Sequence, residues 1–261
     1  MLAEIKRSVQ NRGMVGTARA TLFAIRCQWA VRGMRGLEIG GPSDVFRRFV
    51  PVYKTLHSLD NCVFSSDTIW EGHREDGAAF EFYPGKSGRN RIIDGVELNG
   101  ISDGEYDCVL SCHSLEHIAN PIKALKNWRR AASNLLLVLP YCRETFDHRR
   151  PVTTLTHMIE DFERNIAEDD MSHVREVMEL SDLSRLTLPQ GMTLESAKQL
   201  ADPLHNPQNR CVHHHVFDEQ NSVQLLTHCG YRVLAHQIAA ASIFFFAVSS
   251  RRYRTGIMSI G

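Results

Sequence analysis

Two glycines that follow an acidic residue form the first group with the types and spacing that chemistry needs. The segment is Glu38-Ile39-Gly40-Gly41-Pro42-Ser43. Glycines let a backbone approach a ligand closely, and free N–H groups after a strand can hold an anion. Pro42 removes one such donor and the G-x-G-x-x-G spacing is absent, so the segment is a poor match to a pyrophosphate-binding loop. A tight turn without a ligand is the alternative interpretation.

Two further polar groups follow apolar segments. Asp60, with Asn61 after it, lies twenty residues beyond Gly40. A carboxylate at a strand end can accept hydrogen bonds from both hydroxyls of a ribose, although Asp is also common there for turn reasons. The run 111–117 (SCHSLEH) follows a second apolar segment, where a substrate and a cofactor would meet. A simple strand–helix loop is again the alternative.

Thirteen histidines supply candidates for a general base, because an imidazole titrates near neutral pH. His113 lies in the run 111–117, His148 lies within the segment 147–150 (DHRR), and His214 is the centre of a triple histidine at 213–215. These three are the predicted catalytic residues. Packing or surface exposure is the alternative for each of them.

The triple histidine also permits a metal hypothesis. Side chains alternate along an extended segment, so His213 and His215 would share one side and, with Asp147 or His148, could hold a divalent ion. We favour acid–base chemistry or acceptor contact and assign no metal ligands. Arg149 and Arg150 could bind an anionic acceptor.

Short apolar runs alternate with segments of helical period, which is typical of a parallel sheet wrapped by helices. Asn120 before Pro121 predicts one helix start, and Asp218 with Gly230 predicts the start and end of another. Apolar residues at helical spacing in 155–166 predict a helical insertion. The strands are expected at 36–40, 53–59, 90–93, 106–111, 134–139, 231–239 and 242–250.

The three polar groups therefore lie near strand ends, where ligands bind in open parallel sheets. We expect four parts: a basic cap helix at 1–35, a core at 36–145, a helical insertion over the acceptor at 146–210, and the last helix and two strands of the core at 211–261. Residues 1–35 carry seven basic residues and one acid, and the cap helix is expected to pack on the domain through its apolar residues, namely Leu22, Phe23, Ile25, Trp29 and Val31. A transit peptide or a weak peripheral membrane contact is the alternative for this part.

Composition limits the class of protein. The 261 residues carry 30 basic and 30 acidic side chains, which argues against a protein that coats nucleic acid. No apolar run approaches 18 residues, so no spanning helix is predicted. Seven scattered cysteines without a CxxC pair indicate a reducing, cytoplasmic location. The oligomeric state is not predicted.

Four segments in combination resemble the class I S-adenosylmethionine-dependent methyltransferases. They are LEIGGPS at 37–43, LDN at 59–61, EYDCVLSCHSLEHIANPIKAL at 105–125 and LLLVLP at 135–140. The third is similar to the subgroup with an LEHI-x-x-P segment after strand four. The resemblance implies an α/β, Rossmann-like sheet of seven strands with helices on both faces and an antiparallel C-terminal hairpin. It also implies S-adenosyl-L-methionine as cofactor.

The resemblance assigns cofactor-binding residues by position. Glu38 and Gly40, with Gly41, would hold the methionyl end, and Asp60, with Asn61, the ribose. The other predicted contacts are Asp94, Val96 and Glu97 beside the adenine, and Ser111, Cys112 and His113 facing the methyl-bearing sulfur. Pro42-Ser43 stands where the family usually has a further glycine, so the loop is expected to be stiffer.

The predicted activity is methyl transfer, with an oxygen of a small-molecule, glycan or nucleotide-sugar acceptor as the first hypothesis. A nucleic-acid base methyltransferase is the second, although Ser-Cys-His-Ser replaces the D/N-P-P-Y-type motif that amino-directed members carry after strand four. A non-catalytic binding module of the same fold is the third. A NAD-linked oxidoreductase is the least favoured, because the glycine loop lacks the dinucleotide spacing.

Overall fold

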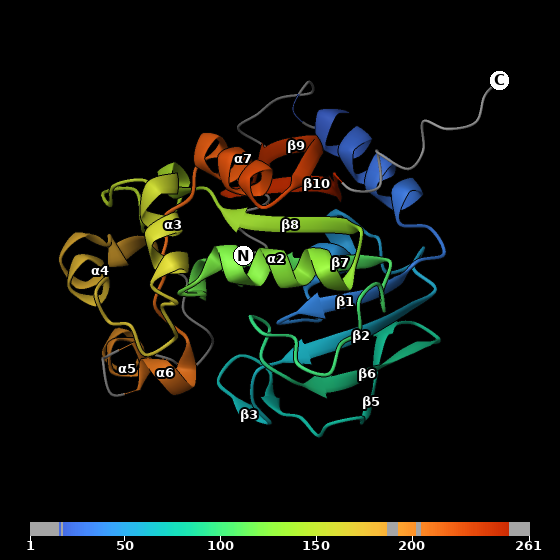
Figure 1. The fold of residues 1–261 in the computed structure, drawn as a ribbon, viewed down its shortest axis with the longest axis horizontal. Coiled ribbons are helices and arrows are strands. Elements are labelled where there is room, and N and C mark those ends of the chain that lie inside the picture. Colours follow the sequence, from blue (N-terminus) through green and yellow to red (C-terminus); the bar gives the residue numbers. More distant parts are fainter. Residues whose placement is uncertain (1–15, 17, 187–192, 202–204, 251–261) are drawn as a thin grey trace.

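The computed structural model describes residues 16, 18–186, 193–201 and 205–250. Eight strands form one sheet in the order β5-β6-β2-β1-β7-β8-β10-β9 (Figure 1). Strands β6, β2, β1, β7 and β8 are parallel, whereas β5 and β10 run antiparallel to their neighbours. The bounds are β1 Arg35–Ile39, β2 Ser58–Val63, β5 Ala79–Tyr83, β6 Lys86–Ile92, β7 Cys108–Cys112, β8 Asn134–Pro140, β9 Tyr231–Ala239 and β10 Ser242–Ser249.

The predicted Rossmann-like α/β class and its C-terminal antiparallel hairpin are confirmed. The strand count is eight rather than seven, because the chain between β2 and β6 forms β5, which pairs with β6 through a turn at Gly85. A separate small hairpin, β3 (Asp67–Thr68) and β4 (Gly72–His73), also lies in this connection.

The second strand begins later than the sequence predicts. Residues 53–57 form turns, and β2 covers Ser58–Val63, so Asp60 and Asn61 lie inside the strand instead of at its end. Tyr53 is fully buried, and its hydroxyl contacts the Glu38 carboxylate. Its ring therefore packs in the core although its backbone forms a turn and not a strand. A short apolar run in the sequence does not distinguish a buried turn from a buried strand.

Two helices begin at the capping residues that the sequence predicts. Asn120 accepts a hydrogen bond from Lys123 N at the start of α2, and Asp218 accepts one from Asn221 N at the start of α7. The described part of the insertion contains helices and no strand. Bounds are α2 Pro121–Ala131, α3 Leu155–Glu163, α4 Val174–Leu180, α5 Leu194–Leu200, α6 Asn206–Asn209 and α7 Glu219–His228.

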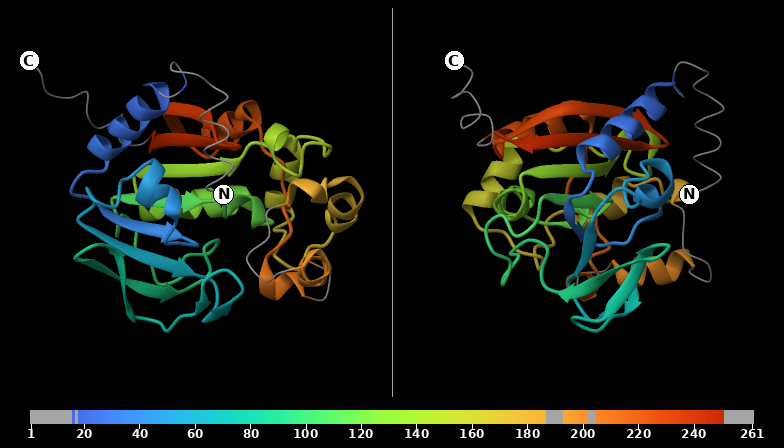
Figure 2. Two further views of the ribbon diagram at one scale, coloured as in Figure 1. Left: turned by 180° about the vertical axis from the view of Figure 1, so that it is seen from behind. Right: turned by 90° about the vertical axis from the view of Figure 1, so that its right-hand side faces the viewer.

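The sheet separates two apolar cores. One core lies between the sheet and α2, α3 and α7, and Trp128 is its largest fully buried side chain. The other lies on the opposite face, beneath a helix at 18–30 and a single π-helical turn, Val45–Phe49 (Figure 2). Helices α4, α5 and α6 lie beyond the carboxyl ends of the parallel strands, at the left of Figure 1.

The helix at 18–30 contacts the sheet through only part of the expected apolar set. Phe23 packs against Phe244, with the ring centroids 6.2 Å apart, and Val31 is fully buried. The other three expected packing residues are exposed, namely Leu22, Ile25 and Trp29. None of the described helices is both long and apolar enough to span a membrane.

Candidate functional site

A cavity of about 1760 Å³ extends from the carboxyl ends of the parallel strands to the helix at 18–30 and the turn between β9 and β10. Strand order reverses between β1 and β7, and such a switch point is where ligands bind in open α/β sheets. Residues from the insertion, including Phe146 and Arg210, line its other side. The lining residues at or just after strand ends are Gly40, Gly41, Val63, Phe64, Cys112, His113, Ser114 and Pro140.

Two glycines keep part of this space open. Gly40 has a φ of +69°, and a Cβ there would lie 2.8 Å from Ser114 Oγ. Gly95 follows β6, and a Cβ there would lie 2.8 Å from Ile39 Cγ2. Both positions line the cavity. A side chain at either one would be crowded, and at Gly40 it would also strain the backbone.

The amides of the glycine loop are engaged inside the protein. Gly41 N donates to Asn61 Oδ1 (2.9 Å) and Ser43 N donates to Glu38 Oε1 (3.1 Å). Tyr53 donates to the second Glu38 oxygen. Glu38 is fully buried, and burial raises its pKa to about 7 although the Tyr53 and Ser43 donors oppose the rise. Glu38 and Asn61 hold the loop and do not line the cavity, and the Gly41–Pro42 peptide bond is cis.

A side chain at Gly41 is expected to destabilise this loop. A Cβ there would lie 2.3 Å from the Glu38 carboxyl carbon. Gly41→Ala should therefore lower the free energy of unfolding by about 1–3 kcal/mol, the usual effect of overpacking. Urea unfolding of Gly41→Ala, Glu38→Ala and the double variant measures the coupling free energy between the two positions. If the two effects simply add, the contact with Glu38 is not the cause.

His113 is held rigidly at the cavity wall. Its φ is +53°, a value uncommon for a residue with a side chain. Nδ1 lies 3.2 Å from Glu116 Oε1 and Nε2 lies 3.0 Å from Ser242 Oγ. Burial raises the pKa of Glu116, but the bond and charge of His113 outweigh it, so the net shift is downward. This pair fixes the imidazole ring beside the end of β7.

A second carboxylate–histidine pair also faces the cavity. His213 Nδ1 lies 2.6 Å from Asp147 Oδ2, and Asp147 Oδ1 accepts from Arg150 Nη1 at 2.8 Å. Burial lowers the pKa of His213, but the Asp147 charge and bond outweigh it and the net shift is upward. The other nitrogen, Nε2, has no hydrogen-bond partner among the residues that the structure describes. His213 thus lines the cavity with a carboxylate partner on Nδ1.

The other two predicted catalytic histidines do not line the cavity. His148 Nε2 lies 2.9 Å from Asp182 Oδ2 on the insertion. His214 is buried with both ring nitrogens unpartnered, and burial lowers its pKa to about 3. The structure brings the neighbouring His213 to the site in its place, because successive side chains of this extended segment point in different directions.

The structure does not support the predicted roles of Arg149 and Arg150 in acceptor binding or of His213 and His215 in a shared metal site. Arg150 is buried between Asp147 and Glu176, and Arg149 contacts Asp182 (3.3 Å), so neither lines the cavity. His213 and His215 do not share one site, although Asp147 does contact His213.

Asp60 is not at the cavity. Oδ1 accepts from Arg89 N (3.1 Å) and Oδ2 accepts from the Tyr106 hydroxyl (2.9 Å), so the carboxylate joins neighbouring parts of the sheet. The acid that lines the cavity after β2 is Glu71, with Oε1 3.9 Å from the position of a Cβ on Gly40. Its Oε2 accepts from Thr68 Oγ1 (2.6 Å), and burial raises its pKa. Thr68 and Glu71 lie in the turn of the β3–β4 hairpin, and no local sequence signal marks Glu71 as a cavity residue.

The residues predicted to flank adenine lie beside the cavity, and Gly95 between them lines it. Asp94 Oδ2 pairs with Arg210 Nη2 at 2.5 Å, and the Arg210 guanidinium lies 4.4 Å from the Phe64 ring centroid. Val96 is buried in the core, and Glu97 pairs with Lys123. Ser111 is buried below the site, whereas Cys112 and His113 line the cavity.

Comparisons with known proteins give distant structural similarity only. No protein-family model matches the chain, and no curated protein matches it in sequence. A SAM-dependent methyltransferase from Aquifex aeolicus is 9% identical, with 86% of this chain and 87% of that chain covered and a TM-score of 0.42. A Burkholderia thailandensis 1,6-didemethyltoxoflavin-N1-methyltransferase, solved with S-adenosylhomocysteine, is 10% identical, with 95% and 86% covered and a TM-score of 0.45.

Proposed function

We propose that the chain is an S-adenosyl-L-methionine-dependent methyltransferase. The observation that carries the proposal is the cavity at the point where strand order reverses, with Gly40 and Gly95 keeping it open. Residues at the ends of β1, β2 and β7 line one part of this cavity, and residues of the segment 144–146 and Arg210 face them across it.

The residues present fit the cofactor. Gly40 and Gly41 would border the methionyl end, and Glu71 would accept hydrogen bonds from the ribose hydroxyls in place of Asp60. Gly95 and the stacked Phe64–Arg210 pair offer a flat surface to the adenine. Cys112 and His113 would face the sulfur. When bound, the cofactor supplies an electrophilic methyl group on a sulfonium.

His213 would accept the acceptor's proton. A hydroxyl oxygen that forms the new C–O bond must lose its hydrogen, and Nε2 of His213 is the free nitrogen of a carboxylate-oriented imidazole. With a sulfonium methyl donor bound, transfer to the hydroxyl oxygen would give the methyl ether and the neutral thioether, and the released proton would reside on His213. Asp147 then stabilises the imidazolium.

The acceptor class that fits best is a hydroxyl-bearing small molecule, glycan or nucleotide-sugar. Arginines from both sides of the cavity line it and can bind anionic groups, namely Arg47, Arg48, Arg74 and Arg185. A methyl-transfer screen over glycans, nucleotide-sugars and small phenols identifies the acceptor. Cofactor binding without transfer to any of these would favour the non-catalytic module instead.

Cofactor binding itself is tested at Gly40. Gly40→Ala should weaken S-adenosylmethionine binding at least about tenfold, because the new Cβ crowds Ser114 and a left-handed residue costs roughly 1–2 kcal/mol. Gly100→Ala is the matched control, since it has a φ of +82° but open space around its Cβ. Isothermal titration calorimetry measures both. Absence of binding to the wild-type chain, or equal losses in the two variants, would refute the site.

A further inference from the structure

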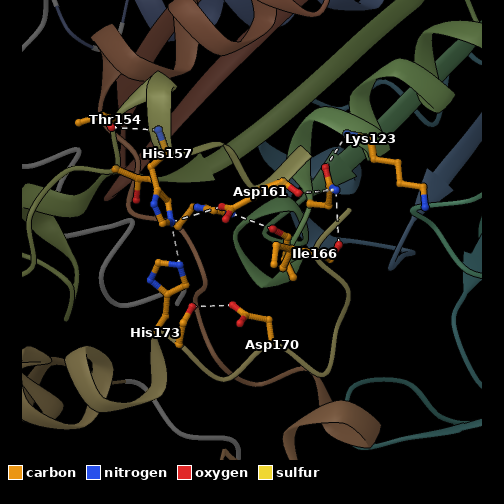
Figure 3. Close-up of polar contacts among 12 residues, drawn as sticks. Lys123, Thr154, His157, Asp161, Ile166, Asp170 and His173 are labelled. Atoms are coloured by element: carbon orange, nitrogen blue, oxygen red, sulfur yellow. Dashed lines mark hydrogen bonds and ion pairs between the residues drawn. The ribbon is translucent and has the colours of Figure 1, made fainter. Parts of the chain in front are cut away.

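Four potential metal ligands meet in the insertion, away from the cavity. His157 and Asp161 lie four residues apart on α3 and therefore on one face of it. His173 immediately precedes α4, and His215 lies in the segment before α7. Their ligand atoms all lie within 4.8 Å of one another. Figure 3 shows His157, Asp161 and His173 pointing toward one another.

The distances between these atoms match a coordination polyhedron. His157 Nε2 lies 3.1 Å from His173 Nε2 and 3.3 Å from Asp161 Oδ2. A tetrahedral Zn²⁺ about 2.0–2.1 Å from each ligand separates the ligand atoms by about 3.3 Å. The cluster thus has nearly the size that a tetrahedral ion requires.

Several polar atoms in the cluster lack a hydrogen-bond partner. Asp161 is 5% exposed and its Oδ2 accepts no hydrogen bond, and His215 is 1% exposed with Nδ1 unpartnered. A buried acceptor without a donor is costly, and a cation would satisfy both lone pairs. The facing nitrogens of His157 and His173 would likewise both direct lone pairs at an ion.

Neighbouring carbonyls complete the second shell of such a site. His215 Nε2 lies 3.1 Å from the Ala119 carbonyl oxygen. Donation from Nε2 to this carbonyl leaves Nδ1 as the ligand, which is the usual arrangement for a metal-bound histidine. The Asp161 carbonyl oxygen accepts from Asn120 Nδ2 (3.3 Å) and Ile166 N (2.9 Å), which anchors α3 to the core (Figure 3).

We propose that His157, Asp161, His173 and His215 bind one divalent transition-metal ion, with Zn²⁺ as the best fit. Three imidazoles and one carboxylate suit this class of ion, and four protein ligands make a closed, structural site. The ion would join α3, the start of α4 and the segment before α7. This segment also carries His213, so the metal would stabilise the side of the cavity that the insertion forms. The proposal does not depend on methyltransferase activity.

Metal binding by the full chain tests the proposal. After chelation, the chain should bind one equivalent of Zn²⁺, and Co²⁺ should give the intense visible absorption of a tetrahedral site. Asp161→Asn and His215→Gln should weaken binding by more than the roughly 10- to 100-fold that loss of a second-shell partner costs. His148→Gln, a histidine of the same insertion outside the cluster, should bind as wild type does.

Four outcomes, three from binding and one from thermal unfolding, would overturn the proposal. The first is that the wild-type chain fails to bind Zn²⁺ at micromolar concentration. The second is that Asp161→Asn binds Zn²⁺ as tightly as the wild-type chain does. The third is that His213→Gln, but not Asp161→Asn, loses the bound equivalent of Zn²⁺. The last would place the ion with Glu116, His117 and His213 instead. Because a variant could fail to fold, the Tm of the wild-type chain is measured with Zn²⁺ and with chelator. Zn²⁺ should raise it, and an unchanged Tm contradicts the site. The same samples are also titrated with S-adenosylmethionine. Loss of Zn²⁺ binding with intact S-adenosylmethionine binding would contradict the metal site alone, and the reverse would contradict the proposed function alone.

Discussion

His213→Gln should lower the rate of methyl transfer by about 10²–10⁴-fold, the usual contribution of a positioned general base. Glutamine retains a polar group at the cavity wall but cannot take up the acceptor's proton. His148→Gln is the matched control, because His148 pairs with Asp182 outside the cavity. The comparison uses kcat/KM with the acceptor identified in the screen. Equal activities of His213→Gln and wild type would exclude His213 as the base.

The pH profile adds a readout that loss of packing would not produce. A general base must be neutral, so activity should rise with pH through a value above the ordinary histidine pKa, because Asp147 raises the pKa of His213 despite burial. Asp147→Asn removes that negative charge, which lowers the pKa of His213. The rise in kcat/KM should then shift to lower pH, and an unshifted profile in a folded variant would contradict the assignment.

Trp128→Ala should lower the free energy of unfolding by about 3–5 kcal/mol. The Trp128 side chain is fully buried between α2 and the sheet, so truncation leaves a large apolar cavity. Its Nε1 also donates to the Gly95 carbonyl oxygen at 2.7 Å. Because Gly95 lines the candidate site, the substitution should also weaken cofactor binding. Urea unfolding and calorimetric titration measure the two effects.

Two further variants separate packing from the hydrogen bond. Trp128→Phe keeps most of the ring volume but leaves the Gly95 carbonyl without its donor, which should cost about 1–3 kcal/mol. Trp29→Ala, at a residue 69% exposed, should change stability by less than about 0.5 kcal/mol. If Trp128→Ala lowered the free energy of unfolding as little as Trp29→Ala does, the Trp128 side chain would not be needed for the stability of the core.

Secondary structure was predictable where one local signal was sufficient. The run 134–139 and the strand 242–250 are largely apolar segments of strand length and form β8 and β10, and the predicted strand 231–239 is β9. Asn120 and Asp218 cap the helices that the sequence predicts. The prediction was wrong for 53–59, where a buried turn and a strand have similar composition, and it missed β5.

The amino-acid sequence by itself determined the α/β class, the hairpin, the helical insertion and the positions of Gly40, Cys112 and His113 at strand ends, because periodicity and capping act over a few neighbouring residues. Only the tertiary structure decided which polar side chains meet. Asp60 lies within β2, Glu71 lies beside Gly40, and His213 pairs with Asp147, 66 residues away in the chain. A shift of one residue in an extended segment reverses the direction of a side chain, so spacing alone could not distinguish His213 from His214.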